Sequence, residues 1–275
     1  MRATIATEPG KTDRENEDWV GATPTVVVLL DGLSSAPGAE SPCHHGTPWF
    51  VQHLGSQLLS TAGNSDRNLR TSLAIAIRDV AALHPECEGN INGAPSATVA
   101  VLRIRPDGVA DYLILADARI VIETIDGIRV ITDERVEHVA EEQKAAALRE
   151  RIGTDEQRQA VADLIATQKP LRNHPDGYWI AAGDPVAARH ALTGTVPVES
   201  IRRAALMSDG ASRIVDVFEE LTWRQALDLV DTHGPQELIR RVREVEATDP
   251  DGLRWPRYKT GDDAAVAFAT WALQE

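Results

Sequence analysis

The chain has 275 residues, of which 43% are hydrophobic, and it carries a formal net charge of −14. This composition is typical of a globular protein with a substantial core, and the acidic balance argues against a nucleic-acid partner, because phosphate binding needs a basic surface. The first residues, MRATIATEPGK, lack the apolar region of a signal peptide, and no apolar stretch reaches the roughly 20 residues of a membrane span. With only two cysteines, the sequence predicts a cytoplasmic protein with no disulfide framework and no membrane partner.

The first part of the chain predicts a strand followed by two helices. Residues 25–30 contain the unbroken apolar run VVVLL, which indicates a buried strand, and residues 47–62 predict a helix. A second helix is predicted over 67–84, because its apolar residues recur at alternating steps of four and three and therefore share one face.

From residue 97 the pattern changes to strands in quick succession. Four are predicted, at 98–104, 109–116, 118–124 and 128–133. The turns RPDG and IDG separate them, so neighbouring strands are expected to pair antiparallel as a meander.

The rest of the chain predicts further helices and strands. Charged helical sequence fills 136–168, and strands are predicted at YWIAA, AALMS and 264–271. Two helices, 222–233 and 235–246, are separated by Gly234-Pro235, with the glycine ending one and the proline starting the next. Helices grouped between antiparallel strands predict an α+β fold with helices packed outside a sandwich of two sheets.

Acidic residues lie next to apolar runs at three distant points of the sequence. Asp31-Gly32 ends VVVLL, Asp209-Gly210 ends AALMS, and Asp262-Asp263 precedes AAVAFATW. A carboxylate at the mouth of a buried strand is costly to desolvate, so three of them suggest strand ends that converge on a cation such as Mg²⁺ or Mn²⁺.

The alternative is that Asp-Gly only marks turns. Asp107-Gly108 and Asp126-Gly127 are followed at once by strand patterns, as in hairpins, and Asp176-Gly177 and Asp251-Gly252 lie in polar loops. The copies at 31 and 209 differ, because each is followed by a serine-bearing segment that predicts a loop rather than a returning strand.

Several phosphate chemistries are excluded by missing motifs. The sequence has no GxxxxGK[ST], no GxGxxG and no GxSxG, and Leu33 stands where an aspartyl-phosphate enzyme has its second aspartate. Carboxylates remain, and a pair of divalent ions held by carboxylates activates a water for in-line attack at phosphorus. The candidate acids are Glu17, Asp18, Asp31, Asp117, Asp209, Asp262 and Asp263.

Six short motifs occur in the order found in one known family. NED at 16–18, DG at 31–32, SATV at 96–99, ADAR at 116–119, SDG at 208–210 and DDAAV at 262–266 resemble those of the bacterial metal-dependent protein phosphatases of type 2C. The resemblance implies a single domain over 1–275 with an αββα sandwich of two antiparallel sheets. It also implies a variable helical flap over 136–170.

The resemblance also implies a metal site with two Mn²⁺ or Mg²⁺ ions. Asp31 would bridge both ions, the Gly32 carbonyl would complete one coordination shell, and Asp209 and Asp262 would hold the other ion. Glu17 and Asp18 would lie near the second ion, and adjacent residues on an extended segment point differently, so at most one is expected to be a direct ligand.

Three further residues complete the implied site. Asp117 matches an aspartate that helps to hold a third ion in many bacterial members. Either Asp262 or Asp263 could match the last ligand, and the alignment of Val266 favours Asp262. Arg14 is the nearest candidate for the phosphate-binding arginine, although it is offset by one residue from the family position, so the catalytic set is Asp31, Asp209 and Arg14.

The function implied is hydrolysis of phosphoserine and phosphothreonine in a phosphorylated protein substrate. Departures from the family motifs, which are DGLSS, ADAR and DDAA, leave two alternatives open. One is a catalytically weak 2C-like binding or regulatory domain, and the other is a hydrolase of small phosphate esters. The sequence does not select a substrate or an oligomeric state.

Overall fold

The structure, a computed structural model, describes residues 1–33, 43–83, 85 and 94–271, and it contains two five-stranded antiparallel sheets. The first sheet has the order β1-β10-β9-β6-β7 and the second has the order β2-β3-β4-β5-β8. The strands of the first sheet are β1 (Arg2–Glu8), β10 (Ala264–Thr270), β9 (Ile201–Met207), β6 (Arg119–Thr124) and β7 (Gly127–Ile131). Those of the second are β2 (Asp18–Ala22), β3 (Val26–Gly32), β4 (Ala97–Ile104), β5 (Val109–Leu115) and β8 (Leu192–Pro197).

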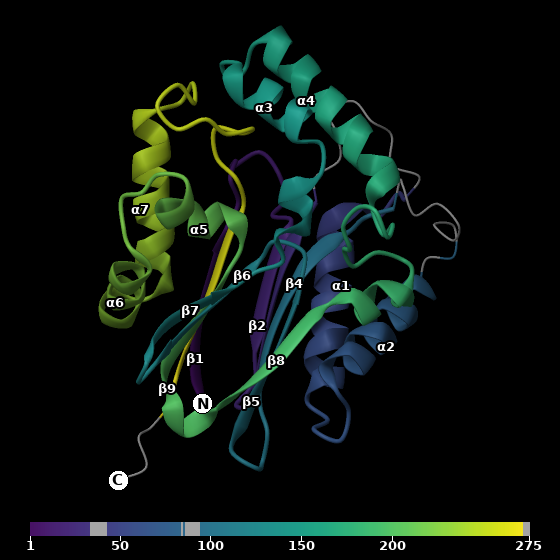
Figure 1. Ribbon diagram of the computed structural model, residues 1–275, viewed down its shortest axis with the longest axis vertical. Helices are drawn as coiled ribbons and strands as arrows, with labels where there is room; N and C mark the ends of the chain where they lie inside the picture. Colours follow the sequence, from purple (N-terminus) through teal and green to yellow (C-terminus); the bar gives the residue numbers. More distant parts are fainter. Residues whose placement is uncertain (34–42, 84, 86–93, 272–275) are drawn as a thin grey trace.

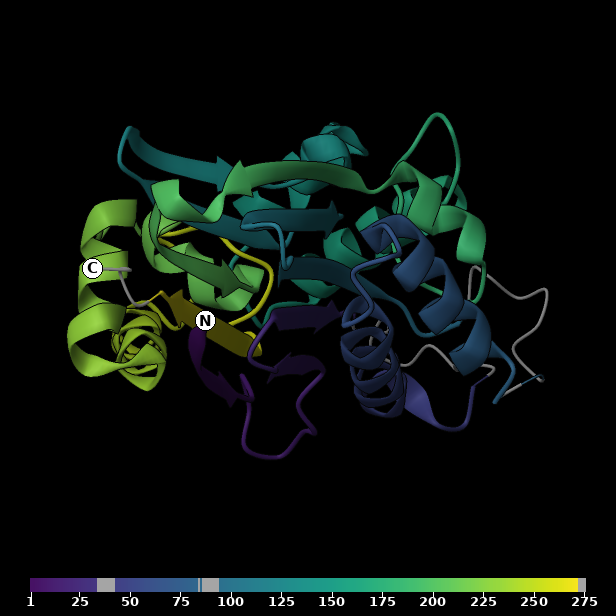
Figure 2. The same cartoon turned by 90° about the horizontal axis from the view of Figure 1, so that it is seen from below.

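Helices cover the outer face of each sheet (Figures 1 and 2). α1 (Gly46–Ala62) and α2 (Leu69–Ala81) pack on the second sheet, and α5 (Asp209–Asp216), α6 (Trp223–His233) and α7 (Pro235–Thr248) pack on the first. The four layers confirm the predicted α+β sandwich of two antiparallel sheets flanked by helices. Short 3-10 helices lie at Glu134–His138, Lys169–Leu171, Pro185–His190 and Val198–Ser200.

β3 shows why its sequence is apolar without interruption. Val26, Val28 and Leu30 face α1 and α2, whereas Val27 and Leu29 face the opposite sheet, and all five are fully buried. Because both faces of this central strand are covered, the usual alternation of apolar and polar residues is absent. The first polar side chain of β3, Asp31, comes only at the end of the strand.

The predicted meander is wrong at one connection. β4 pairs with β5 and β6 pairs with β7, as expected from their turns, but β5 and β6 belong to different sheets. The chain crosses between the sheets at Ala116–Ala118, where Ala116 has a left-handed backbone with φ of 63°. The crossing places Asp117 between the two sheets rather than in a hairpin.

Two other predictions are corrected. The segment 178–182 is buried but contributes only isolated bridges, so its apolar character reflects burial and not strand pairing. The segment after Asp209 is the helix α5 and not a loop. The serine-bearing loop predicted after Gly32 falls largely at residues 34–42, outside the described part of the chain.

The charged segment forms α3 (Glu141–Arg149) and α4 (Asp155–Gln168), which lie above one end of the sandwich (Figure 1). α4 and the connection between the two helices contact the loop between α7 and β10: Gln157 of α4 donates to the Tyr258 carbonyl at 2.9 Å, and Arg151 of the connection pairs with Asp251 at 2.6 Å. The helical nature of this segment is confirmed, while its role as a flap stays a prediction. Within the described residues, no helix is long and apolar enough to cross a membrane.

Candidate metal centre

Three of the predicted acids meet where strands of the second sheet approach α5. Asp18 opens β2 and lies directly opposite Asp31 of β3 in the antiparallel register. The backbone N–H of Asp209, at the start of α5, donates to Asp31 Oδ2 at 3.2 Å. Residues separated by 178 positions are therefore joined by a direct hydrogen bond between the two halves of the sandwich.

The glycines of the two Asp-Gly pairs allow this close approach. The Gly32 N–H donates to the Glu17 carbonyl at 3.0 Å, and a Cβ on Gly32 would lie 2.3 Å from that oxygen. A Cβ on Gly210 would lie 1.9 Å from the Asp263 carbonyl oxygen. Both contacts are with backbone atoms, so neither position has room for a side chain.

Burial dominates the electrostatics of Asp18 and Asp31. It raises the pKa of both carboxyl groups well above the usual value, and repulsion from neighbouring carboxylates adds to the effect. Asp18 Oδ2 is buried and has no hydrogen-bond partner among the described residues. An unpaired buried carboxylate oxygen is a costly arrangement unless a cation neutralises it.

Asp209 and Asp117 belong to the same electrostatic group. Burial, followed by repulsion from Asp262, raises the pKa of Asp209. Burial, followed by repulsion from Asp209, raises the pKa of Asp117 to about 6. These four acids hold more negative charge than nearby cations balance, and carboxylate oxygens are the ligands that Mg²⁺ and Mn²⁺ prefer.

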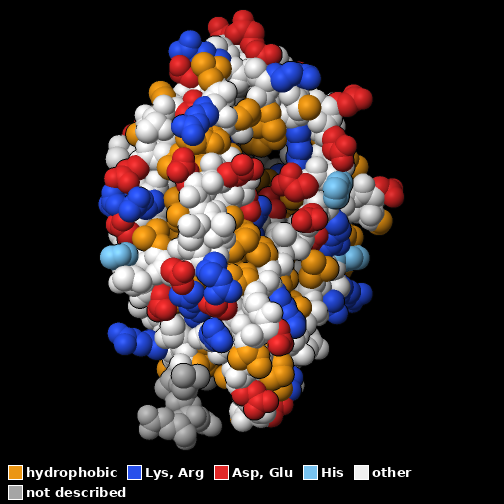
Figure 3. Space-filling view, turned by 60° about the vertical axis from the view of Figure 1, so that its left-hand side comes forward, with side chains coloured by type: hydrophobic (Ala, Val, Ile, Leu, Met, Phe, Trp, Pro, Cys, Tyr) orange, Lys and Arg blue, Asp and Glu red, His pale blue; other side chains and the backbone are white. Residues whose placement is uncertain are grey.

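The coordination geometry itself is not assembled. Among the described residues, no group of three or more His, Cys, Asp and Glu side chains is arranged so that it could hold a metal ion. A space-filling view shows Asp and Glu side chains around a hollow in the upper half of the molecule (Figure 3). The donor chemistry and the unpaired Asp18 oxygen fit a divalent cation, whereas the positions of the carboxylates fit it only in part.

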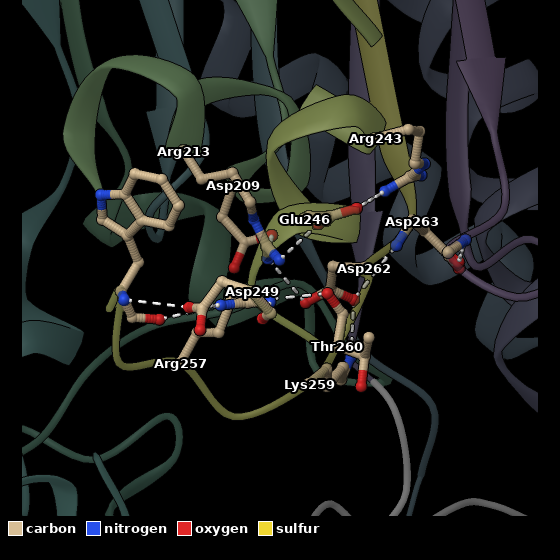
Figure 4. Close-up of polar contacts among 12 residues, drawn as sticks. Asp209, Arg213, Arg243, Glu246, Asp249, Arg257, Lys259, Thr260, Asp262 and Asp263 are labelled. Carbon is tan, nitrogen blue, oxygen red and sulfur yellow. Dashed lines mark hydrogen bonds and ion pairs between the residues drawn. The ribbon is translucent and has the colours of Figure 1, made fainter. Parts of the chain in front are cut away.

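Asp262 and Asp263 have different partners. Both oxygens of Asp263 accept backbone N–H groups, from Gly10 at 2.7 Å and from Glu17 at 2.6 Å, so this residue joins the segment after β1 to the start of β10. Asp262 Oδ1 accepts from Lys259 Nζ at 2.7 Å and its Oδ2 accepts from Arg213 Nη2 at 3.1 Å (Figure 4). Burial alone would raise the pKa of Asp262, but the two cations lower it.

Lys259 and Arg213 were not predicted as members of the site. Arg213 lies one turn after Asp209 on α5, and Lys259 lies three residues before Asp262. The i,i+4 spacing of Asp209 and Arg213 is a recognisable signal on a helix. The spacing carries no such meaning in a loop, which is what the sequence predicts after Asp209.

Glu17, Arg14 and Arg119 complete the comparison with the sequence. Glu17 is half-buried; its backbone N–H donates to the Asp263 carboxylate, and its carbonyl accepts from the Gly32 N–H. Arg14 is exposed between β1 and β2, and its side chain forms no ion pair with an acid in the described part of the chain. Arg119 forms an ion pair with Asp216, and it also donates to the Asp117 carbonyl at 2.6 Å.

Comparison with solved structures places this fold among bacterial phosphatases. The *Mycobacterium tuberculosis* serine/threonine phosphatase PstP/Ppp is similar with a TM-score of 0.58 and 16% identity, over 98% of this chain and 97% of that chain. The *Mycobacterium smegmatis* phosphatase MsPP is similar with a TM-score of 0.56 and 17% identity, over 99% of both chains. For Stp1 of *Staphylococcus aureus* the TM-score is 0.54 and the identity 14%, over 98% of this chain and 94% of that chain.

A search of curated proteins found no match. The family model for protein phosphatase 2C, in contrast, matches residues 16–246. That range runs from the NED motif through the SDG motif into the last turn of α7, and so contains the Asp18–Asp31–Asp209 contact described above. The chain therefore belongs to the protein phosphatase 2C family.

Proposed function

We propose that this protein is a metal-dependent phosphatase that hydrolyses phosphoserine and phosphothreonine in a phosphorylated protein substrate, using Mn²⁺ or Mg²⁺. The observation that carries the proposal is the cross-strand pair of buried Asp18 and half-buried Asp31, the second of which accepts a hydrogen bond from the Asp209 backbone. The family match supports the reaction class. The solved catalytic domain of PstP, 16% identical, contains two manganese ions, which supports the choice of cofactor.

The carboxylates of Asp31, Asp18 and Asp209 and the Gly32 carbonyl are the proposed ligands, with Asp117 and Glu17 at the margin of the site. When bound, a divalent ion supplies an acidified water that is available as hydroxide near neutral pH. The chain's own contribution is position: the Asp209 N–H fixes one oxygen of Asp31, and the second oxygen of Asp18 is left for a cation. Asp262 can take part only in so far as its two cationic partners permit.

Arg14 remains the proposed phosphate-binding residue. It lies in the segment between β1 and β2 that also leads to Glu17 and Asp18, and its exposed guanidinium suits a substrate group arriving from solvent. Binding of phosphate by a residue outside the acidic cluster avoids the repulsion that the cluster itself would exert.

The test is phosphate release from a phosphothreonine peptide with Mn²⁺, with excess EDTA, and in the Asp31→Asn variant. We expect EDTA to abolish release and Asp31→Asn to lower kcat by about 100-fold or more, since it removes a charge that stabilises the bound cation. Asp79→Asn, which removes a carboxylate on α2 paired with Arg78, is the matched control and should keep full activity.

Two results would contradict the proposal. EDTA-resistant hydrolysis would show that no divalent ion is needed, and full activity of Asp31→Asn would place the site elsewhere. Metal binding without turnover of any phosphopeptide would point to the binding or regulatory domain, and turnover of p-nitrophenyl phosphate alone would point to small phosphate esters.

A further inference from the structure

Asp262 is the one family-type ligand whose two oxygens already contact cationic side chains. Lys259 Nζ is 2.7 Å from one oxygen and Arg213 Nη2 is 3.1 Å from the other. The Lys259 ammonium also acts electrostatically on Asp209 and Asp31, which means that it lies among the acids and not only beside Asp262. A divalent ion at Asp262 would have to displace at least one of these side chains.

Arg213 is held in place from behind by α7. Its side chain is 8% exposed, and its Nη1 donates to Glu246 Oε1 at 3.1 Å. The other oxygen of Glu246 accepts from Arg243 at 2.8 Å, so the acid is itself fixed (Figure 4). Removing one partner from a buried ion pair leaves an uncompensated buried charge, which strongly destabilises the folded protein. Arg213 is therefore a permanent member of the site.

Lys259 is presented by a loop with its own internal framework. The carboxylate of Asp249 accepts the backbone N–H groups of residues 253, 254 and 255, and pairs with Arg257 at 2.9 Å. Arg257 in turn donates through Nε to the Thr260 carbonyl at 3.3 Å. Asp249 and Arg257 are both buried, and their contacts fix the shape of the loop on both sides of Lys259.

An ammonium ion and a divalent ion compete for the same place. Mg²⁺ requires oxygen ligands at about 2.0–2.1 Å and a near-ideal octahedral shell, and an ammonium hydrogen-bonded to one of those oxygens occupies one of its two lone pairs and repels the ion. The contrast with Asp18 is direct, because Asp18 Oδ2 has no hydrogen-bond partner among the described residues while both Asp262 oxygens have one.

We infer that Lys259, with Arg213 behind it, takes the place of one divalent ion at Asp262, so that this chain holds its metal only on the Asp18–Asp31 side. The inference rests on the proposed function, since it concerns the same site. It assigns to Lys259 the task of a built-in cation that neutralises Asp262 and part of the charge of Asp209.

The test counts bound Mn²⁺ by isothermal titration calorimetry and by elemental analysis after dialysis. Lys259→Met removes the ammonium and keeps most of the aliphatic length, and Lys259→Arg keeps a cation. Lys169→Met removes the same charge from an exposed position outside the acidic site and controls for the general effect of net charge. Circular dichroism and thermal unfolding in EDTA establish that each variant is folded.

We expect Lys259→Met to bind one Mn²⁺ more than the native chain, or to bind its weakest ion at least about tenfold more tightly. Lys259→Arg and Lys169→Met should match the native chain. The added ion should also raise the thermal midpoint of Lys259→Met further than that of the native chain at equal Mn²⁺, because a ligand that binds only the folded state stabilises it.

Equal stoichiometry and affinities within about threefold in the native chain and Lys259→Met would overturn the inference. If both then show EDTA-sensitive hydrolysis of the phosphopeptide, the proposed function stands while the inference fails. A gain of one ion by Lys259→Met without phosphopeptide hydrolysis by either protein would uphold the inference and overturn the proposed function. Absence of Mn²⁺ binding in both proteins would overturn both.

Discussion

Replacing Asp117 by Asn should stabilise the metal-free protein, and the gain should depend on pH. Burial and the neighbouring Asp209 raise the pKa of Asp117 from 3.8 to about 6, so the folded chain binds this proton more tightly than the unfolded chain does. The contribution of the carboxyl group to stability is therefore fully present below pH 3.8, and it is lost as the pH rises to about 6 and beyond. Asn keeps the shape of the side chain without the charge.

The magnitude follows from the size of the shift. A change of about 2 pKa units corresponds to about 3 kcal/mol, since each unit is worth about 1.4 kcal/mol. Linkage then predicts that the free energy of unfolding of Asp117→Asn exceeds that of the native chain by about 1.5 kcal/mol at pH 5.0 and about 3 kcal/mol at pH 7.5. These are upper values, because Asp117 is only partly buried and solvent screens its charge.

The assay is equilibrium unfolding in urea at both pH values, in EDTA and at constant ionic strength, with matched m-values required for comparison. Asp66→Asn, in an exposed turn before α2, is the control and should show no pH-dependent gain. A constant difference between Asp117→Asn and the native chain at the two pH values would refute the reasoning. It would show that Asp117 ionises as a solvated group and that the crossing between β5 and β6 carries no electrostatic strain.

Two further predictions test the packing around the site. Gly210→Ala should lower the free energy of unfolding by about 2 kcal/mol or more, because the new Cβ would lie 1.9 Å from the Asp263 carbonyl oxygen. The measurement is thermal unfolding, with Gly183→Ala as the control, because a Cβ at Gly183 would meet nothing within 4 Å. Equal unfolding midpoints in the two variants would contradict the prediction. Arg257→Leu should lower the free energy of unfolding in urea by about 3 kcal/mol, because it leaves buried Asp249 with backbone donors only. The control Arg254→Leu, which loses a cation–π contact 3.9 Å from the Trp255 ring centroid, should lower it by at most about 1 kcal/mol. Similar losses in both variants would contradict a special role for the Asp249–Arg257 pair.

The fold was predictable wherever a pattern is local and long. The unbroken apolar run of β3 and the period of α2 indicate their structures directly, because full burial and one-sided burial leave different traces in sequence. β1, β2 and β8 were not predicted. β1 and β8 are largely exposed strands with mixed residues, so their pairing is decided by the neighbouring strand and not by their own composition.

The crossing at Ala116–Ala118 could not be predicted from its residues. It contains no glycine or proline, yet Ala116 takes a left-handed backbone, which alanine adopts only when surrounding structure requires it. Here the surroundings are two sheets that each need one end of the connection, β5 in one and β6 in the other. That requirement exists only in the assembled sandwich.

The acids of the site were predictable as candidates because each sits at a strand end or in a recognisable motif. Their charge balance was not, since it depends on Lys259, a single basic residue in a polar segment, and on Arg213, whose i,i+4 spacing from Asp209 is a signal only if the segment is a helix. Lys259 reaches Asp262 because the Asp249–Arg257 pair shapes its loop, and Arg213 does so because Glu246 of α7 holds it. Each of these causes comes from a different part of the chain.

The opposite pKa directions within one cluster divide the site into two halves. Burial raises the pKa of Asp18, Asp31 and Asp117, which means that these acids favour a proton or an added cation over the free carboxylate. Asp262 is equally part of the cluster, yet the two basic side chains lower its pKa. In a site built for two equivalent cations, we would expect the acids on both sides to have raised pKa values. The fold thus supplies, from α5 and the loop before β10, two positive charges on the Asp262 side of the acidic cluster.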